Sequence, residues 1–240
     1  MAFSSAFVNS IAGGGYGTML TPPLLLMGFN PIQFIPSILL SHSIISFILI
    51  YSNRKKYQCE SPCYNEKKLI SYIIFFGIIG IISSIFLLSI LNEFYVQLYI
   101  ALLTIILGGL LIFLRKRKLI FSYKIMMGIS LIAAFNKGIS GGGYGTIISS
   151  GQMLSGVECK KALSNCFYAE AIISLIGFFI FVVFIQNFII FELTIFILIG
   201  AFLAVPFATR IMHRITNNKL TLIIGFLLII LGIITLIQVL

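Results

Sequence analysis

The stretch Ala12-Gly13-Gly14-Gly15-Tyr16-Gly17-Thr18 determines how this chain can fold, because it recurs 128 residues later as Ser140-Gly141-Gly142-Gly143-Tyr144-Gly145-Thr146. Each copy interrupts a long apolar run. Three successive glycines are unfavourable in a helix, since each costs about 1 kcal/mol relative to alanine. In lipid, a broken helix also exposes backbone groups that have no water to bond, so such breaks persist only inside protein or beside a cavity. Two breaks at corresponding positions of two halves point to the binding site of a transporter.

The composition is that of a polytopic membrane protein. Of 240 residues, 60% are hydrophobic and 9% are charged, and the mean hydropathy is +1.14. A soluble domain has about 25% charged residues, so that class is excluded. The net charge of +10 could suggest nucleic acid, but basic residues of membrane proteins gather in cytoplasmic loops. We therefore expect the lipid bilayer as a partner and no nucleic acid.

Long apolar runs predict helices of about 20 residues, enough to span a membrane. The expected spans are 32–51, 68–91, 94–114, 162–185, 188–209 and 219–240. The motif regions 3–27 and 123–155 differ, because each has about ten or more mostly apolar residues on either side of its glycines. Ten helical residues reach about 15 Å, half of the hydrocarbon core. Each region is therefore either one broken span or a hairpin that enters and leaves on the same side.

The placement of Lys and Arg distinguishes these topologies. If both motif regions are re-entrant hairpins, every basic cluster falls on one side, which accounts for 15 of the 16 basic residues. The positive-inside rule then favours six spans plus two hairpins, with cytoplasmic basic loops and both termini outside. The alternative is eight continuous helices whose glycines allow close helix packing. The clusters are Arg54, Lys55, Lys56, Lys67 and Lys68; Arg115, Lys116, Arg117, Lys118 and Lys124; Lys160 and Lys161; and Arg210, Arg214 and Lys219.

The predicted fold is an all-α membrane domain of two inverted repeats, about 1–118 and 119–240. Each repeat has a glycine-broken re-entrant hairpin followed by three transmembrane helices. The first hairpin dips in from outside and the second from the cytosol, so a pseudo-twofold axis in the membrane plane relates them. The two glycine tips are then expected to meet near the middle of the bilayer.

Both repeats resemble the TauE/SafE family of sulfite exporters and related sulfur-anion permeases. The first repeat matches at Gly13-Gly14-Gly15, Pro22-Pro23, Leu24-Leu25-Leu26 and Gly28. The second matches at Gly141-Gly142-Gly143, Leu154 and Gly156, with Ser150 and Gly151 in place of the proline. The sharp part of the resemblance covers about 20 residues of each repeat. It implies membrane transport of a small anion, commonly a sulfur-containing one such as sulfite, thiosulfate or an organosulfonate.

The motif residues form a candidate anion site. Consecutive backbone amides in a turn create a concave nest for anions, and helices that start after the glycines add their positive N-termini. The alternative is that the glycines only allow the two tips to pack together. The candidate substrate-binding residues are Gly13, Gly14, Gly15, Tyr16, Thr18, Ser140, Gly141, Gly142, Gly143, Tyr144, Thr146 and Lys137.

Three ionisable residues, His42, Lys137 and Glu170, lie outside the predicted loops. The 128-residue offset maps His42 onto Glu170 and Lys137 onto Asn9. Charges at this depth are costly and usually face a cavity or a partner. His42 and Glu170 could relay protons, and Lys137 could supply a positive charge to the substrate. The alternative is a hydrogen-bonded His42 and a Lys137–Glu170 ion pair that only stabilises the hairpin.

The same polar helix faces carry further candidates for contact with substrate. These are Ser37, Ser41, Asn165 and Cys166. Cys166 could meet a reactive sulfur species, although a buried inert thiol is the more common case. Cys59 and Cys63 share a loop that is cytosolic in this topology, where persistent disulfides are rare. Two thiols alone are a weak metal signal, so we expect no metal and no cofactor.

Two other function classes remain to be separated from a transporter. Potassium channels use Thr-Val-Gly-Tyr-Gly in four loops of like orientation, whereas here two Gly-Gly-Gly-Tyr-Gly loops point in opposite directions. An intramembrane enzyme is the less favoured class, because the chain has no Asp and no His-Glu-x-x-His cluster.

Overall fold

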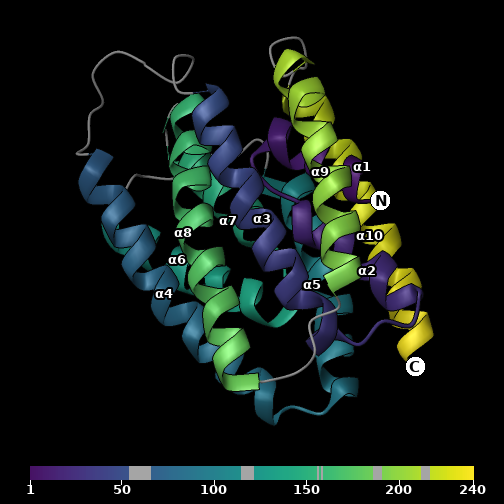
Figure 1. Ribbon diagram of the computed structural model, residues 1–240. Coiled ribbons are helices and arrows are strands. Elements are labelled where there is room, and N and C mark those ends of the chain that lie inside the picture. The colour runs from purple at the N-terminus through teal and green to yellow at the C-terminus, as the bar shows by residue number, and fades with distance from the viewer. Residues whose placement is uncertain (54–65, 115–121, 156, 158, 186–190, 212–216) are drawn as a thin grey trace.

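A computed structural model describes all residues except 54–65, 115–121, 156, 158, 186–190 and 212–216, and in the described part the chain is helical with no strand. The helices (Figure 1) are α1 Ala2–Ala12, α2 Tyr16–Leu26, α3 Pro31–Asn53, α4 Glu66–Ile90, α5 Glu93–Leu114, α6 Tyr123–Ser140, α7 Tyr144–Leu154, α8 Cys159–Ile185, α9 Phe191–Ile211 and α10 Asn217–Val239.

The helix bounds agree closely with the six long spans expected from hydropathy, which correspond to α3, α4, α5, α8, α9 and α10. Both motif regions are broken at their glycines, so the alternative of continuous helices through the motifs is wrong. The segment before the second break is longer than the one before the first, since α6 has 18 residues and α1 has 11. α3 begins at Pro31, and Asn30 Oδ1 accepts a hydrogen bond from the Ile32 amide at 3.0 Å, as an N-cap does.

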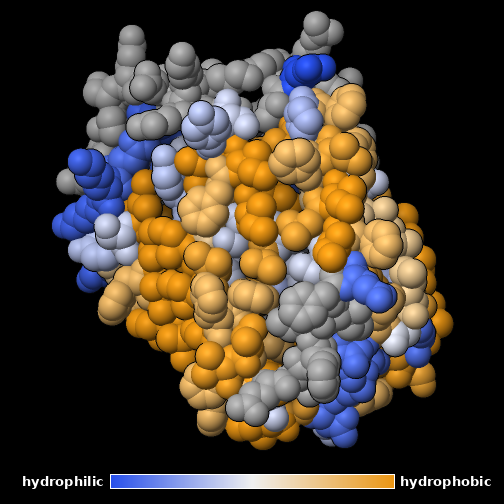
Figure 2. Space-filling model, viewed as in Figure 1, coloured by the Kyte–Doolittle hydropathy of each residue, from blue (hydrophilic) through white to orange (hydrophobic). Residues whose placement is uncertain are grey.

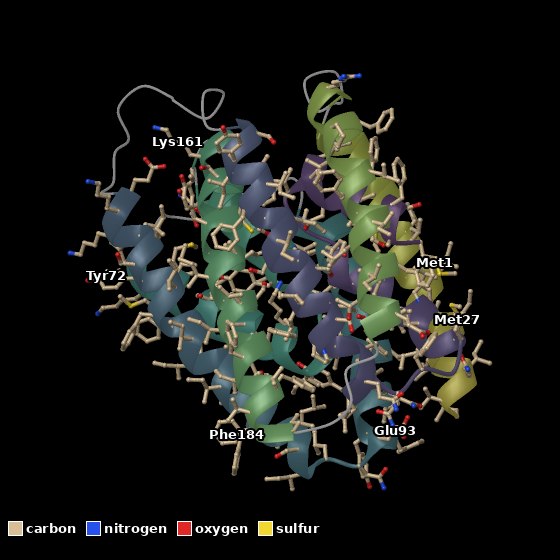
Figure 3. The ribbon with its side chains drawn as sticks, viewed as in Figure 1. Met1, Met27, Tyr72, Glu93, Lys161 and Phe184 are labelled. Atoms are coloured by element: carbon tan, nitrogen blue, oxygen red, sulfur yellow. The ribbon has the colours of Figure 1, made fainter. Side chains whose placement is uncertain are left out.

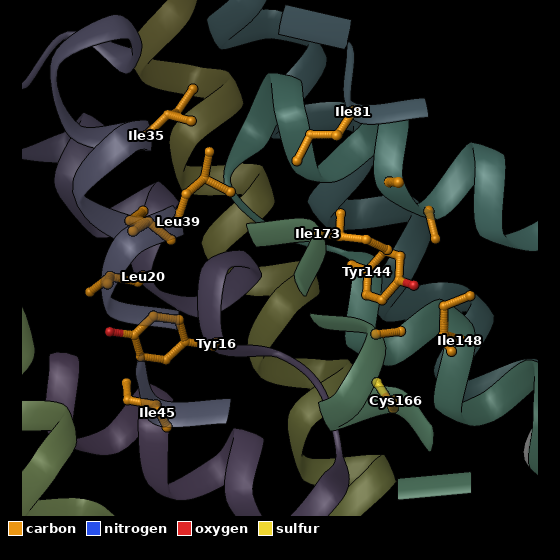
Figure 4. Close-up of a cluster of buried hydrophobic side chains, with 14 of the residues drawn as sticks. Tyr16, Leu20, Ile35, Leu39, Ile45, Ile81, Tyr144, Ile148, Cys166 and Ile173 are labelled. Atoms are coloured by element: carbon orange, nitrogen blue, oxygen red, sulfur yellow. The ribbon is translucent and has the colours of Figure 1, made fainter. Parts of the chain in front are cut away.

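The long helices pack around α2, α7 and the two glycine breaks. α3 packs between α8 and α9, α4 packs on α6 and α8, and α5 packs on α10. Apolar side chains from both halves of the chain form the core. Figure 4 shows this core around Tyr16, with Leu20, Leu39 and Ile45 near it, and around Tyr144, with Ile148 and Ile173 near it. The core therefore fixes the two motif tyrosines and, with them, the starts of α2 and α7.

The surface is that expected of a membrane protein. Figure 2 shows a broad hydrophobic face, with hydrophilic residues at the upper left, at the top and at the lower right. Four helical stretches in the described part are long and apolar enough to cross a membrane: Pro31–Ser52, Glu66–Ile90, Glu93–Leu110 and Lys161–Ile185. The described apolar stretches of α9 and α10 are shorter, Glu192–Ala208 and Phe226–Val239. The chain is thus a helical membrane protein.

Several sequence features lie outside the described residues. These are Cys59 and Cys63, Gly156, and the basic residues at 54–56, 115–118 and 214.

Candidate functional site

The outer glycines of each motif break the helix by adopting a left-handed backbone. Gly13 ends α1 with φ 71° and Gly15 precedes α2 with φ 103°. Gly141 and Gly143 repeat this arrangement with φ 71° and 85°. Positive φ is costly for residues with a Cβ, so glycine at these positions allows each chain to leave one helix and start the next.

The inner glycines serve a different purpose, because they let the two motifs touch through their backbones. A Cβ built on Gly14 would lie 2.1 Å from the Thr146 amide nitrogen, and one built on Gly142 would lie 2.3 Å from the Thr18 amide nitrogen. A Cβ on Gly17 would lie 1.9 Å from the Gly141 carbonyl oxygen. The two tips therefore meet as expected, and tip packing accounts for the absence of side chains at the inner positions.

The helices that start at this contact have amides without partners. The first amide–carbonyl bonds join Met19 to Gly15 in α2 and Ile147 to Gly143 in α7. Within the described residues, no acceptor bonds the three amides that precede each of these, which belong to Tyr16, Gly17, Thr18, Tyr144, Gly145 and Thr146. All six of these residues are buried. Since buried amides are nearly always bonded, these donors need acceptors that the described residues do not supply.

The hydroxyl side chains of the motifs divide into bonded and free groups. The Tyr16 hydroxyl donates to Ser41 Oγ at 2.9 Å. Ser140 Oγ donates to a carbonyl oxygen in its own helix at 2.8 Å and accepts from the Gly142 amide at 3.2 Å. Thr146 Oγ1 donates to the Gly143 carbonyl at 3.0 Å. Thr18 Oγ1, by contrast, is buried and has no partner in the described structure, so it remains available to a ligand.

The three ionisable residues form one buried cluster. His42 Nε2 lies 3.1 Å from Glu170 Oε2, and Lys137 Nζ lies 3.4 Å from Glu170 Oε1. Lys137 Nζ also lies 2.8 Å from His42 Nδ1 and 5.6 Å from the centre of the Tyr144 ring. The Lys137–Glu170 ion pair that the sequence left as one alternative is thus present, and His42 joins it.

One arrangement of protons fits these distances when Lys137 is an ammonium. A lysine ammonium can only donate, so His42 Nδ1 accepts from Lys137. The other imidazole nitrogen, Nε2, then carries the hydrogen and faces the Glu170 carboxylate. The imidazole is neutral in this arrangement, and the three side chains together carry no net charge. A proton added to His42 would place an N–H against the Lys137 ammonium and break that hydrogen bond.

This cluster adjoins the glycine contact. A Cβ built on Gly145 would lie 2.9 Å from Glu170 Oε1, so the carboxylate sits beside the first turn of α7. The rings of His42 and Tyr16 lie 4.8 Å apart, centre to centre, beside the first turn of α2. The two helix starts therefore have different neighbours, a carboxylate at α7 and an imidazole at α2.

Residues 128 positions apart meet at the crossing of α3 and α8. His42 contacts Glu170, and Ser43 Oγ donates to the Ala171 carbonyl at 2.9 Å. The bounds of α2 and α7 and the starts of α3 and α8 also differ by 128 residues. The correspondence seen in the sequence is therefore also a correspondence of helices in space.

The other candidates for substrate contact have protein partners. Ser37 Oγ accepts from Thr194 at 2.7 Å, and Ser41 accepts from Tyr16. The Asn165 amide nitrogen donates to Gln152 at 2.9 Å. The Cys166 thiol is buried, 3.4 Å from the Gly13 carbonyl oxygen and 3.7 Å from that of Gly145. These four side chains brace the glycine tips or the neighbouring helices in this structure.

Two polar residues near the tips were not singled out from the sequence. The Tyr99 hydroxyl bonds Asn136 Oδ1, and Asn136 lies beside Gly143. Asn136 directly precedes Lys137, but a single asparagine in an apolar run gave no sign of its partner on α5. The described residues include no group of three or more His, Cys, Asp or Glu side chains arranged to hold a metal ion.

Comparison with known proteins supports one family. No curated protein and no solved structure gave a significant match. The family model described as "Sulfite exporter TauE/SafE" matches residues 1–235, nearly the whole chain and both glycine motifs. This family comprises membrane transporters rather than enzymes, and the chain is a member of the TauE/SafE sulfite exporter family.

Proposed function

We propose that this chain is a secondary transporter of a small sulfur-containing anion, such as sulfite, thiosulfate or an organosulfonate, held between the two glycine motifs near the middle of the bilayer. The observation that carries this proposal is the set of six buried amides without acceptors at the starts of α2 and α7. An oxyanion supplies the acceptors that these amides lack.

Two helix N-termini at one contact make an electrostatically suitable place for an anion. Each helix start carries the equivalent of about half a positive charge, and such termini bind phosphate and sulfate in many proteins. The inner glycines of each tip pack on the backbone of the other tip, so the amides at both helix starts converge on one place. We propose Gly13, Gly14, Gly15, Tyr16 and Thr18, with their counterparts in the second motif and Ser140, as the binding elements.

Beside this site, Lys137 and Glu170 form an ion pair that the negative charge of a bound substrate anion would perturb. Glu170 already lies beside the start of α7, where its negative charge is favourable. A bound anion would repel this carboxylate and attract Lys137, which is 3.4 Å from it. We propose that proton uptake at His42 or Glu170 compensates for this change, which couples transport to pH.

The topology that we propose has two re-entrant hairpins in inverted repeats, about 1–118 and 119–240, within one membrane domain. The packing of α7 on α6 supports the second hairpin, because a Cβ on Gly151 would lie 3.2 Å from Ile129 and 3.9 Å from Met126. A helix continuing across the membrane after the break would place these residues far apart. Lys161, at the start of α8, and Glu93, at the start of α5, lie at opposite ends of the molecule (Figure 3).

Thiol labelling tests this topology. We expect a cysteine introduced at 116, in a variant without other cysteines, to be labelled by an impermeant maleimide only after sealed cells are opened. A cysteine introduced at Glu93 is the matched control and should be labelled from outside. Labelling of position 116 from outside would contradict the two-hairpin topology and the cytoplasmic basic loops.

Flux into proteoliposomes tests the proposed function. We expect saturable uptake of at least one of sulfite, thiosulfate and taurine, together with competition among them, and no potassium current. Potassium conductance without anion uptake would favour the channel alternative. A folded protein that moves none of these anions would contradict the proposal.

A further inference from the structure

Gly143, the residue that precedes α7, and its counterpart Gly15 have different neighbours. A Cβ built on Gly143 would lie 3.1 Å from Leu107 Cδ1, 3.7 Å from Asn136 Cβ and 3.9 Å from Thr18 Cγ2. A Cβ built on Gly15 would lie 3.5 Å from Val8 Cγ1 and 3.9 Å from both the Met19 sulfur and Thr18 Oγ1. Val8 and Asn136 are 128 residues apart, so an amide on one side of the contact replaces an isopropyl group on the other.

The Asn136 side chain is held in one orientation. Its Oδ1 accepts the hydroxyl hydrogen of Tyr99, which reaches across from α5. The amide nitrogen at the other end of the group has no hydrogen-bond partner in the described structure, although Asn136 is only 6% exposed. Thr18 turns its methyl group toward this glycine and its hydroxyl toward Gly15. The Asn136 amide and the free amides of α7 are therefore the donors near Gly143.

We propose that Asn136 is a substrate-binding residue whose amide N–H groups donate to an oxyanion at the start of α7, and that Tyr99 is the residue that positions it. This inference rests on the proposed function and names contacts outside both glycine motifs. All donors at this point are neutral: a side-chain amide and backbone amides. Hydrogen bonds from neutral donors to an ionised oxygen are individually strong and depend on direction, so these groups select oxyanions by the arrangement of their oxygens.

Sulfite binding to purified variants tests this inference. Asn136→Asp keeps the shape and the acceptor for Tyr99 but removes both N–H donors, and we expect it to raise the Kd for sulfite about tenfold or more. Tyr99→Phe should raise the KM for sulfite flux several-fold with kcat unchanged. Tyr95→Phe, on the exposed face of the same helix, is the matched control and should alter neither value.

The outcomes separate this inference from the proposed function. Wild-type affinity in a folded Asn136→Asp variant would overturn the role of Asn136. If the Asn136→Asp variant does not fold, the Tyr99→Phe variant provides the test instead. A KM and a kcat equal to those of Tyr95→Phe would overturn the inference and leave the proposed anion transport unaffected. If the wild-type protein binds neither sulfite nor thiosulfate nor taurine, the proposed function fails together with the inference.

Discussion

A methyl group at Gly14 is the most informative single change to the glycine contact. Its Cβ would lie 2.1 Å from the Thr146 amide nitrogen, 2.4 Å from the Gly145 carbonyl carbon and 2.7 Å from Thr146 Cα. Ordinary contacts of this kind begin near 3.4 Å, so the two tips would have to separate by more than 1 Å. All three clashing atoms belong to the backbone, which cannot rotate away as a side chain can.

The expected cost of Gly14→Ala is about 1–3 kcal/mol, the usual range for overpacking a well-packed interior. For a chain of 240 residues, this corresponds to a fall in Tm of about 2–12 °C. The separation also moves apart the helix starts that hold the anion, so sulfite affinity should fall with stability. Gly142→Ala should behave similarly, because its Cβ would lie 2.3 Å from the Thr18 nitrogen.

Fluorescence-detected size-exclusion chromatography after heating measures the change in Tm. With a fluorescent tag, the method does not depend on tryptophan fluorescence, and this chain has no tryptophan. Gly109→Ala is the matched control, because a Cβ there meets nothing within 4 Å and alanine favours the helix by about 1 kcal/mol. A Gly14→Ala protein as stable as Gly109→Ala would refute direct contact between the tips. Reduced stability with normal sulfite affinity would show that the contact is structural and that the anion binds elsewhere.

Three further predictions concern the buried charges and Thr18. Glu170→Gln leaves Lys137 as an uncompensated buried cation, so stability should fall by about 3–5 kcal/mol; adding Lys137→Met should restore most of it, and no recovery would contradict the ion pair. His42→Gln removes the imidazole that contacts both Glu170 and Lys137, so sulfite flux measured from pH 5.5 to 8 should lose part of its pH dependence; an unchanged profile would refute a role in proton coupling. Thr18→Val removes a buried hydroxyl that has no protein partner, so sulfite Kd should rise while Tm holds; the reverse pattern would make this hydroxyl structural.

Much of the fold follows from the sequence, because hydropathy and glycine placement act locally. The apolar run over 32–51 predicts α3, which spans Pro31–Asn53, and Pro31 after Asn30 predicts its start. The three glycines at 141–143 predict the break between α6 and α7. These features depend on residues that are near each other in the chain, so the sequence pattern alone is sufficient to predict the helices and their breaks.

The contacts within the site could be anticipated only in part. The 128-residue offset related His42 to Glu170, but only the crossing of α3 and α8 shows that they touch. The offset gave no reason to connect Tyr99 with Asn136, since Tyr99 lies on a helix outside the motif pattern. The dual use of the glycines, left-handed at Gly13 and in close contact at Gly14, likewise depends on how the two tips meet in space.

Locating a bound anion tests the central claim most directly. Selenite has the charge and the pyramidal shape of sulfite, and selenium gives an anomalous diffraction signal at a known wavelength. Crystals of the wild-type protein soaked in selenite should show one selenium peak between the two glycine motifs, within hydrogen-bonding reach of the α7 amides and of Asn136. A protein that transports sulfite but shows selenium only at the basic ends of the helices, with none between the motifs, would contradict the claim.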